Sequence, residues 1–255
     1  MWPYPRVLAH RGGGTLAPEN TLAALRCGMA AGFRAVEFDV MLARDGVPVL
    51  MHDPDFGRTV AGTGRVADHD AHALARMDAG AWFGPAFAGE PVPSFGDFAR
   101  ACKAHGVWMN VEIKPAPGHD AATGRTVARM VAALFVPELA AGAVARVPLL
   151  SSFSEDALRS ARAAAPAVPR ALLVDALPPD WEARARALDV AALHVDHHAL
   201  DAASAAAVKA AGFGLFCYTV NDPARARTLL GWGVDGFCTD RIDLIGPDFA
   251  GQGQQ

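Results

Sequence analysis

Features of membrane-spanning, secreted and nucleic-acid-binding proteins are missing from this 255-residue sequence. No window approaches the roughly 20 consecutive apolar residues of a membrane helix, and the opening stretch MWPYPRVLAHRGGG lacks the apolar run of a signal peptide. The net charge is −4 and no basic run stands out, so nothing supports a broad positive surface for nucleic acid. We therefore expect no membrane insertion and no nucleic-acid partner, and an anionic ligand would need a local positive site.

Cysteine is scarce, and its spacing argues against thiolate sites. The four cysteines are far apart and form no CxxC pair: Cys27, Cys102, Cys217 and Cys238. Zinc ligation by cysteine therefore has little support, and we expect buried, reduced thiols in a cytoplasmic protein. The sequence leaves the oligomeric state open.

The chain is rich in alternating strand and helix patterns. Hydrophobic residues make up 52% and charged residues 20%, which is ample for a buried core. Eight strand–helix units follow one another, which requires a parallel sheet with helices outside it. At this length they predict an α/β fold, a (β/α)8 TIM barrel spanning residues 1–255 as one domain. An open doubly wound sheet is disfavoured because GxGxxG and GxxxxGK[ST] are absent. The expected strands are 6–10, 36–40, 107–113, 147–152, 170–174, 191–195, 214–220 and 234–238, and the expected helices are 18–31, 94–105, 123–134, 155–165, 180–188, 201–211 and 223–230.

One segment, at about residues 53–92, interrupts this alternation after the second strand. It is too long for an ordinary connection, and loops of this size are usually lids or small subdomains. We expect it to cover the barrel mouth and to influence which substrate fits. Its Trp82 and Phe83 are candidate pocket residues, as are Phe153 and Tyr218 near two strand ends, although aromatic side chains lie more often in a core.

The second strand carries two carboxylates, Glu37 and Asp39, between apolar residues. Strand side chains repeat every two residues, so both carboxylates lie on one face. Such a pair is costly unless a cation lies between its members. With His52 just downstream, the pattern predicts a hard-metal site with an acid/base group beside it. The alternative is an edge strand whose polar face meets solvent.

The third strand adds Glu112 and, two residues later, Lys114. Functional groups of a barrel gather at the carboxyl ends of its strands, which lie about 4.8 Å apart. Three carboxylates from the second and third strands can therefore converge on one ion, and all-oxygen ligation favours Mg²⁺ or Ca²⁺ over zinc. A plain salt bridge between Glu112 and Lys114 is the competing interpretation.

The first strand ends in His10-Arg11. Arg11 and Lys114 are cations suited to phosphate oxygens. His10 alone could be a hydrogen-bonded core histidine, but its place at a strand end beside Arg11 favours catalysis. The histidines of the HVDHH stretch lack a further carboxylate motif, and we expect a solvated loop there: His194, His197 and His198.

Five sequence blocks, HRGGGTLAPENTLAA, VEFDVMLARDGVPVLMHD, VEIKP, YTVND and VDGFCTD, resemble the signature blocks of the glycerophosphodiester phosphodiesterase family. The resemblance runs from about residue 10 to residue 240 and keeps the family's order. It implies a (β/α)8 barrel with a small insertion after the second strand, which hydrolyses a small glycerophosphodiester to sn-glycerol 3-phosphate and an alcohol with one divalent cation. The implied roles are metal ligands Glu37, Asp39 and Glu112, acid/base residues His10 and His52, and phosphate-binding residues Arg11 and Lys114.

Two further expectations concern the boundaries of the site. The family usually has tryptophan where this chain has Tyr218. Tyrosine keeps an aromatic face but adds a hydroxyl, so this difference concerns which substrate is preferred and not the chemistry. Glu19 and Asn20 are expected to shape the loop or, with Thr21, to cap the following helix, and they stay outside the catalytic set.

Two other functions compete with soluble diester hydrolysis. One is a related barrel lyase that cleaves membrane phospholipids, which the missing apolar anchor and basic patch disfavour. The other is a silent barrel that only binds a phosphorylated ligand, which the presence of both histidines and all three carboxylates disfavours. A turnover assay distinguishes the silent barrel from the two enzymes, and a comparison of soluble diester with vesicle substrate distinguishes the hydrolase from the lyase. Within the leading hypothesis, we expect His52 to act as the acid.

Overall fold

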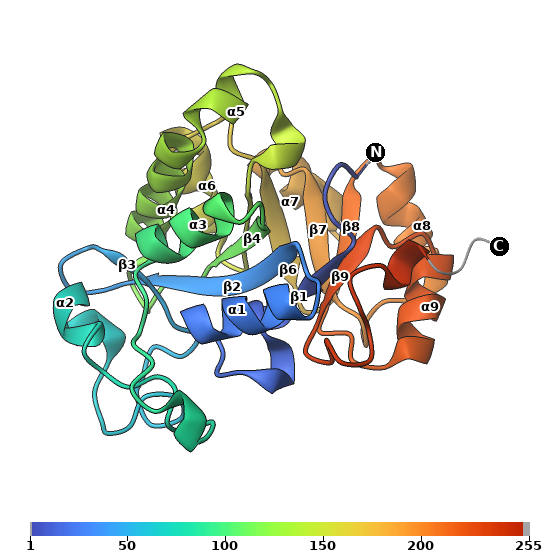
Figure 1. The fold of residues 1–255 in the computed structure, drawn as a ribbon. Coiled ribbons are helices and arrows are strands. Elements are labelled where there is room, and N and C mark those ends of the chain that lie inside the picture. The colour runs from blue at the N-terminus through green and yellow to red at the C-terminus, as the bar shows by residue number, and fades with distance from the viewer. Residues whose placement is uncertain (1, 252–255) are drawn as a thin grey trace.

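The computed structural model describes residues 2–251 and shows a closed parallel barrel (Figure 1). Each of its eight strands pairs with the next, and the barrel closes because β1 pairs with both β9 and β2. The predicted (β/α)8 barrel is therefore confirmed. Its parallel strands are β1 Val7–Ala9, β2 Ala35–Leu42, β4 Trp108–Ile113, β5 Leu149–Ser152, β6 Arg170–Val174, β7 Ala192–Asp196, β8 Gly214–Tyr218 and β9 Gly236–Thr239.

The helices lie outside the barrel. They are α1 Leu22–Ala30, α3 Phe95–Ala104, α4 Asp120–Leu134, α5 Val136–Ala140, α6 Glu155–Ala164, α7 Trp181–Leu188, α8 Ala202–Ala210 and α9 Pro223–Gly231. The first helix begins four residues later than predicted, because Asn20 has a positive φ of 58° and the Thr21 side chain caps the helix by accepting a hydrogen bond from Ala24 N. Among residues 2–251, no helix combines the length and the hydropathy that a membrane crossing requires.

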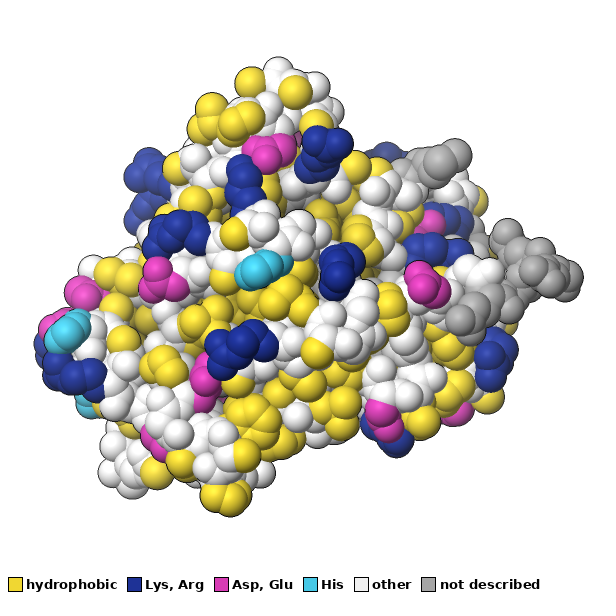
Figure 2. Space-filling view, in the orientation of Figure 1, with side chains coloured by type: hydrophobic (Ala, Val, Ile, Leu, Met, Phe, Trp, Pro, Cys, Tyr) yellow, Lys and Arg dark blue, Asp and Glu magenta, His cyan; other side chains and the backbone are white. Residues whose placement is uncertain are grey.

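Apolar side chains close one end of the barrel and leave the other end polar. Trp2, Tyr4 and Trp108 form an aromatic stack at the amino ends of the strands, with the Tyr4 and Trp108 ring centroids 4.8 Å apart. Polar side chains therefore gather at the carboxyl ends. On the face drawn in Figure 2, basic side chains are scattered among acidic ones and form no continuous positive area.

The segment from residue 53 to residue 92 is a small unit packed on the barrel. It holds one helical turn, α2 (Ala71–Leu74), and lies below and to the left of the barrel in Figure 1. A short strand that the sequence did not predict, β3 (Pro48–Leu50), pairs antiparallel with β2 and leads into it. The apolar cluster of this insertion joins side chains of the β2–β3 hairpin to its own: Met41, Val49, Met51, Val60, Val66, Leu74 and Val92.

Candidate active site

The three predicted carboxylates lie together at the carboxyl ends of β2 and β4. Glu37 and Asp39 point to the same side of β2, and Asp39 is the register partner of Glu112 on β4. Carboxylate oxygens of all three lie within 4.8 Å of one another. Glu37 is 5% exposed and Asp39 is 2% exposed, and β2 lies between β1 and β4. The alternative of a solvated edge strand is therefore wrong.

Clustering changes the protonation of these carboxylates. Burial, together with the negative charges of Asp39 and Glu112, raises the pKa of Glu37 well above its usual value. Burial and Asp39 likewise raise the pKa of Glu112 to about 7. Burial opposes ionisation of Asp39 too, but Arg11 and Lys114 outweigh it and lower the pKa of that carboxyl. The positive charges of Arg11 and Lys114 are therefore not enough to stabilise the ionised form of all three carboxylates.

The donor set fits a hard divalent cation. Among the described residues, Glu37 Oε1 and Glu112 Oε1 are buried without a hydrogen-bond partner. Oxygen-only ligation by several carboxylates suits Mg²⁺ or Ca²⁺. Lys114 Nζ lies 3.6 Å from Asp39 Oδ1 and 3.7 Å from Glu112 Oε1, so it is shared between two carboxylates and does not form a closed pair with Glu112.

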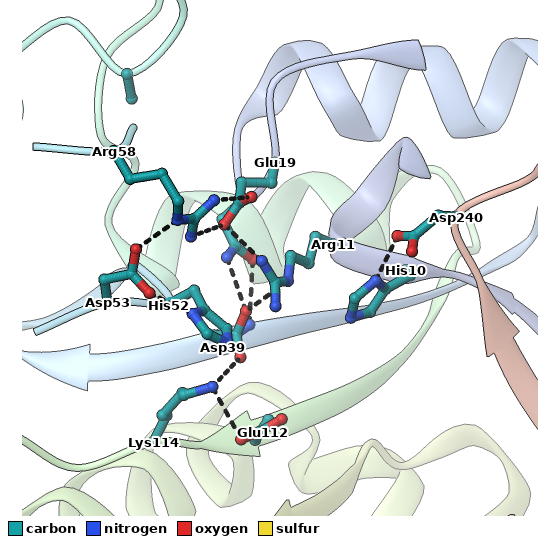
Figure 3. Close-up of polar contacts among 12 residues, drawn as sticks. His10, Arg11, Glu19, Asp39, His52, Asp53, Arg58, Glu112, Lys114 and Asp240 are labelled. Carbon is teal, nitrogen blue, oxygen red and sulfur yellow. Dashed lines mark hydrogen bonds and ion pairs between the residues drawn. The ribbon is translucent and has the colours of Figure 1, made fainter. Parts of the chain in front are cut away.

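Both predicted histidines face this cluster, and each is held by an aspartate (Figure 3). His10 Nδ1 lies 2.6 Å from Asp240 Oδ1, and His52 Nδ1 lies 2.6 Å from Asp53 Oδ1. His10 Nε2 is 3.6 Å from Glu37 Oε2. With Nδ1 bound to an aspartate, the other ring nitrogen of each histidine is left for proton transfer.

The surroundings of the two dyads also shift their pKa values. Burial lowers the pKa of His52, with Asp39 opposing and Arg11 adding to this effect. Although burial opposes it, the hydrogen bond from His10 helps lower the pKa of Asp240. Neither aspartate was given a role from the sequence, yet a signal existed, because Asp53 directly follows His52 and Asp240 directly follows β9.

The residues around Arg11 are more closely involved than predicted. Arg11 Nη1 donates to Glu19 Oε1 at 2.8 Å, and Arg11 Nε lies 3.4 Å from Asp39 Oδ2. Asn20 donates from Nδ2 to Asp39 Oδ2 at 2.9 Å and accepts from the Asp39 backbone N–H at 3.1 Å. Thus Asn20 is not the helix cap but holds a cluster carboxylate in place.

A cavity of about 270 Å³ opens beside these groups. Both histidines, Arg11, Lys114, Glu37 and Glu112 line it, and its apolar wall contains Phe153, Leu173, Phe216 and Tyr218. The Tyr218 hydroxyl donates to Val174 O at 2.9 Å, which fixes its ring against Phe153. Two of the four candidate pocket residues therefore line this cavity.

The other two candidates, Trp82 and Phe83, line a second cleft. It shares His10 and Arg11 with the first cavity, measures about 460 Å³ and is bordered by Asp240. The Trp82 indole N–H donates to Ala79 O at 2.9 Å, so the ring is anchored within the insertion while remaining 44% exposed. The site thus has two lobes that meet at His10 and Arg11.

The expectation of a solvated histidine loop is wrong for His194. This residue lies on β7, is 1% exposed, and its ring stacks at 4.6 Å on Phe216 inside the barrel. Burial lowers the pKa of His194 to about 3. His197 is also buried, and its Nδ1 accepts a hydrogen bond from Arg225 Nε, whereas His198 is exposed.

A parallel barrel with a buried carboxylate cluster and two histidine–aspartate dyads at its carboxyl end defines a (β/α)8-barrel enzyme with an acid/base site. Comparison with known sequences identifies the family. Residues 10–244 match the Glycerophosphoryl diester phosphodiesterase family, and the chain belongs to it. The predicted family is confirmed, and the chain is a glycerophosphodiester phosphodiesterase, a hydrolase.

Three relatives and solved structures illustrate the match over nearly the whole chain. A glycerophosphodiester phosphodiesterase of Caldanaerobacter subterraneus subsp. tengcongensis is 29% identical over 240 residues, covering 94% of this chain and 95% of the relative. A solved phosphodiesterase of Oleispira antarctica, in complex with the product sn-glycerol-3-phosphate, is 33% identical, with a TM-score of 0.85 over 94% of this chain and 95% of that one. The glycerophosphodiester phosphodiesterase of Agrobacterium tumefaciens is 27% identical, with a TM-score of 0.79 over 97% and 99% of the two chains.

Proposed function

We propose that this enzyme hydrolyses small glycerophosphodiesters to sn-glycerol 3-phosphate and an alcohol with the help of one divalent cation. The observation that carries the proposal is the cluster of three carboxylates, with oxygens within 4.8 Å of one another, between two histidine–aspartate dyads. The product named in the Oleispira complex supports the choice of substrate class.

Glu37, Asp39 and Glu112 would hold the cation, Mg²⁺ or Ca²⁺. When bound, the ion supplies positive charge that polarises a phosphoryl oxygen and offsets charge in the transition state. Arg11 and Lys114 line the same cavity and bind the remaining phosphate oxygens.

His10 and His52 divide the proton transfers. One removes the proton from the attacking hydroxyl, either water or the glycerol 2-hydroxyl, as the new P–O bond forms. Attack by water gives sn-glycerol 3-phosphate directly, whereas attack by the 2-hydroxyl gives a cyclic phosphate first, which water then opens to sn-glycerol 3-phosphate in a second displacement. The other donates a proton to the alkoxide as the old P–O bond breaks. We assign His52 as the acid. Asp240 and Asp53 each accept a hydrogen bond from Nδ1, which leaves the unprotonated Nε2 of the base free to take a proton and the Nε2–H of the protonated acid free to give one.

The second cleft, which Trp82 and Phe83 line, would receive the alcohol group. A diester carries two organic groups on its phosphorus, and the two lobes meet at His10 and Arg11. The small volume of the first cavity suits the glycerol group, because small-molecule sites measure about 300–1,000 Å³. The insertion would therefore select among alcohols.

A panel of glycerophosphodiesters tests this function. The enzyme is incubated with choline, ethanolamine, inositol and glycerol diesters, with and without chelator, and sn-glycerol 3-phosphate is measured. We expect metal-dependent release that returns when Mg²⁺ or Ca²⁺ is restored. Cleavage of phospholipid vesicles in preference to every soluble diester, or binding without turnover, would contradict the proposal.

A further inference from the structure

One side chain of the insertion contacts both sides of the site. Arg58 lies between Asp53 and Glu19 (Figure 3). Its Nε donates to Asp53 Oδ2 at 2.6 Å, its Nη1 to Glu19 Oε2 at 2.6 Å, and its Nη2 to Glu19 Oε1 at 2.8 Å. The contact with Glu19 is bidentate, a geometry that fixes orientation as well as charge.

Each of these carboxylates also forms a hydrogen bond with a residue of the proposed active site. Asp53 binds His52 Nδ1, and Glu19 accepts from Arg11 Nη1. A continuous chain therefore runs Arg11–Glu19–Arg58–Asp53–His52. Its ends are the phosphate-binding cation and the acid/base histidine, and its centre comes from the insertion.

The Arg58 side chain is 43% exposed, but its two carboxylate partners are more buried than those of ordinary surface ion pairs, which contribute little. The Glu19 side chain is 13% exposed and the Asp53 side chain is 29% exposed. Burial opposes ionisation of Asp53, but hydrogen bonds from Arg58 and His52 outweigh it and lower the pKa of Asp53 to about 2. Arg58 is thus one of the two groups that keep Asp53 ionised.

The loop that carries Arg58 is fixed to the body of the insertion. Phe56 N donates to Gly64 O at 2.9 Å, and Gly57 N donates to Val60 O at 2.8 Å. Val60 is buried in the apolar cluster on the β2–β3 hairpin. The place of the Arg58 guanidinium is therefore set by how the insertion packs on the barrel.

We propose that Arg58 is a positioning residue through which the packed insertion orients both His52 and Arg11. This inference rests on the proposed function of those two residues. Without Arg58, Arg11 would be the only arginine bound to Glu19, and Glu19 would pull the Arg11 guanidinium away from the substrate phosphate. Asp53 would then be held only by His52, the residue that it orients.

The test compares Arg58→Gln with Arg65→Gln. Arg65 belongs to the same insertion and makes a bidentate pair with Asp68 at 2.8 and 2.9 Å, away from the site. We expect Arg58→Gln to lower kcat, raise KM and weaken calorimetric affinity for sn-glycerol 3-phosphate. The loss in kcat/KM should be about 10²-fold, the scale of a misplaced site. Arg65→Gln should leave all three unchanged.

Single changes at the two carboxylates separate positioning from general damage. Asp53→Asn should lower kcat with little change in product affinity, and Glu19→Gln should do the reverse, because each breaks one half of the chain. If Arg58→Gln matches Arg65→Gln, or loses activity only in proportion to its unfolded fraction, the proposal is wrong. If Arg58→Gln does not fold, Arg58→Lys is the deciding variant, because lysine keeps the charge but cannot form the bidentate contact. Wild-type kcat and KM in Arg58→Lys would overturn the proposal, and a change in either value would support it.

The failure of this inference is distinct from failure of the proposed function. A wild-type enzyme that cleaves no diester refutes hydrolysis, and the positioning role is then decided by product affinity alone. Weaker affinity in Arg58→Gln than in Arg65→Gln supports it, and equal affinity overturns it. A wild type that neither cleaves a diester nor binds sn-glycerol 3-phosphate overturns both.

Discussion

At the scale of single residues, the site contains buried acidic groups whose ionised forms are unstable without a bound cation. Glu37 and Glu112 are buried acids with raised pKa values, and each has an oxygen without a hydrogen-bond partner within the described part of the chain. Folding places them together although their repulsion costs stability. A bound cation would relieve that cost, so metal binding should be visible in stability as well as in activity.

Glu112→Gln tests the metal site without an activity assay. In the wild type, Mg²⁺ or Ca²⁺ should raise Tm, because a ligand at 100 times its Kd stabilises the folded state by about 2.7 kcal/mol. The variant should lose this response, while its metal-free form should unfold at or above the wild-type temperature, since a repelled buried acid is gone. Differential scanning calorimetry measures both, with the surface change Glu182→Gln as the control. A wild-type metal response in Glu112→Gln would remove this residue from the ligand set.

The two histidines should respond differently to the leaving group. His10→Ala and His52→Ala should each lower turnover of the natural diester by roughly 10²- to 10⁴-fold and leave metal affinity largely intact. A diester whose alcohol is a very good leaving group needs no acid. It should therefore restore the His52 variant and not the His10 variant. Equal failure of both on that substrate would refute the division of roles, and restoration of the His10 variant alone would reverse it.

At the scale of elements, the insertion contributes side chains directly to the site. It delivers Arg58 to the site, places Trp82 beside His10, and buries part of the β2–β3 hairpin. The sequence predicted only that this segment covers the barrel mouth and influences which substrate fits, and from that expectation its exchange for a short loop would change selectivity alone. Complete replacement would instead expose Met41, Val49 and Met51 and remove Arg58, so a change in selectivity alone is no longer expected from it.

Trp82→Ala is the sharper test of alcohol selection. Removing the indole should change the ranking of choline, ethanolamine, inositol and glycerol diesters in kcat/KM by about 10-fold or more for the best-fitting alcohol, because its contact with the leaving group is lost. Affinity for sn-glycerol 3-phosphate should stay near the wild-type value. Val136→Ala, on the exposed helix α5, is a control for loss of a surface apolar side chain. An unchanged ranking would show that the second cleft does not hold the alcohol.

At the scale of the whole molecule, His194 makes stability depend on pH. Its pKa is about 3 in the folded barrel, against an ordinary value of about 6.5 in the unfolded chain. Below pH 6.5, His194 therefore binds a proton in the unfolded chain but stays neutral in the folded chain until the pH approaches 3. The stabilisation is complete above pH 6.5 and is lost progressively as the pH falls toward 3.

His194→Gln should remove this part of the acid sensitivity. The free energy of unfolding of the wild type should fall more steeply than that of the variant, with a difference in slope of up to about 1.4 kcal/mol per pH unit between pH 6 and 4. Urea unfolding across that range measures both curves, and the other titrating groups cancel in the difference. Parallel curves would show that folding does not shift the pKa of His194.

The sequence by itself determined the barrel and which polar side chains gather in its site. Strand alternation places Glu37 with Asp39, and parallel strands end at one edge, so local periodicity was enough to gather the carboxylates, His10, Arg11 and Lys114. The orientation of His194 could not be predicted in this way, because barrel strands are apolar on both faces and the pattern does not distinguish inside from outside.

Only the tertiary structure decided which partners hold these groups. Asp240 meets His10 because barrel closure brings β9 beside β1, across 230 residues of sequence separation. Arg58 joins Glu19 to Asp53 because an apolar cluster fixes the insertion on the β2–β3 hairpin. Periodicity predicts which face of a helix or strand a side chain occupies. These contacts depend instead on how elements that are distant in sequence pack together, and a local pattern does not predict that packing.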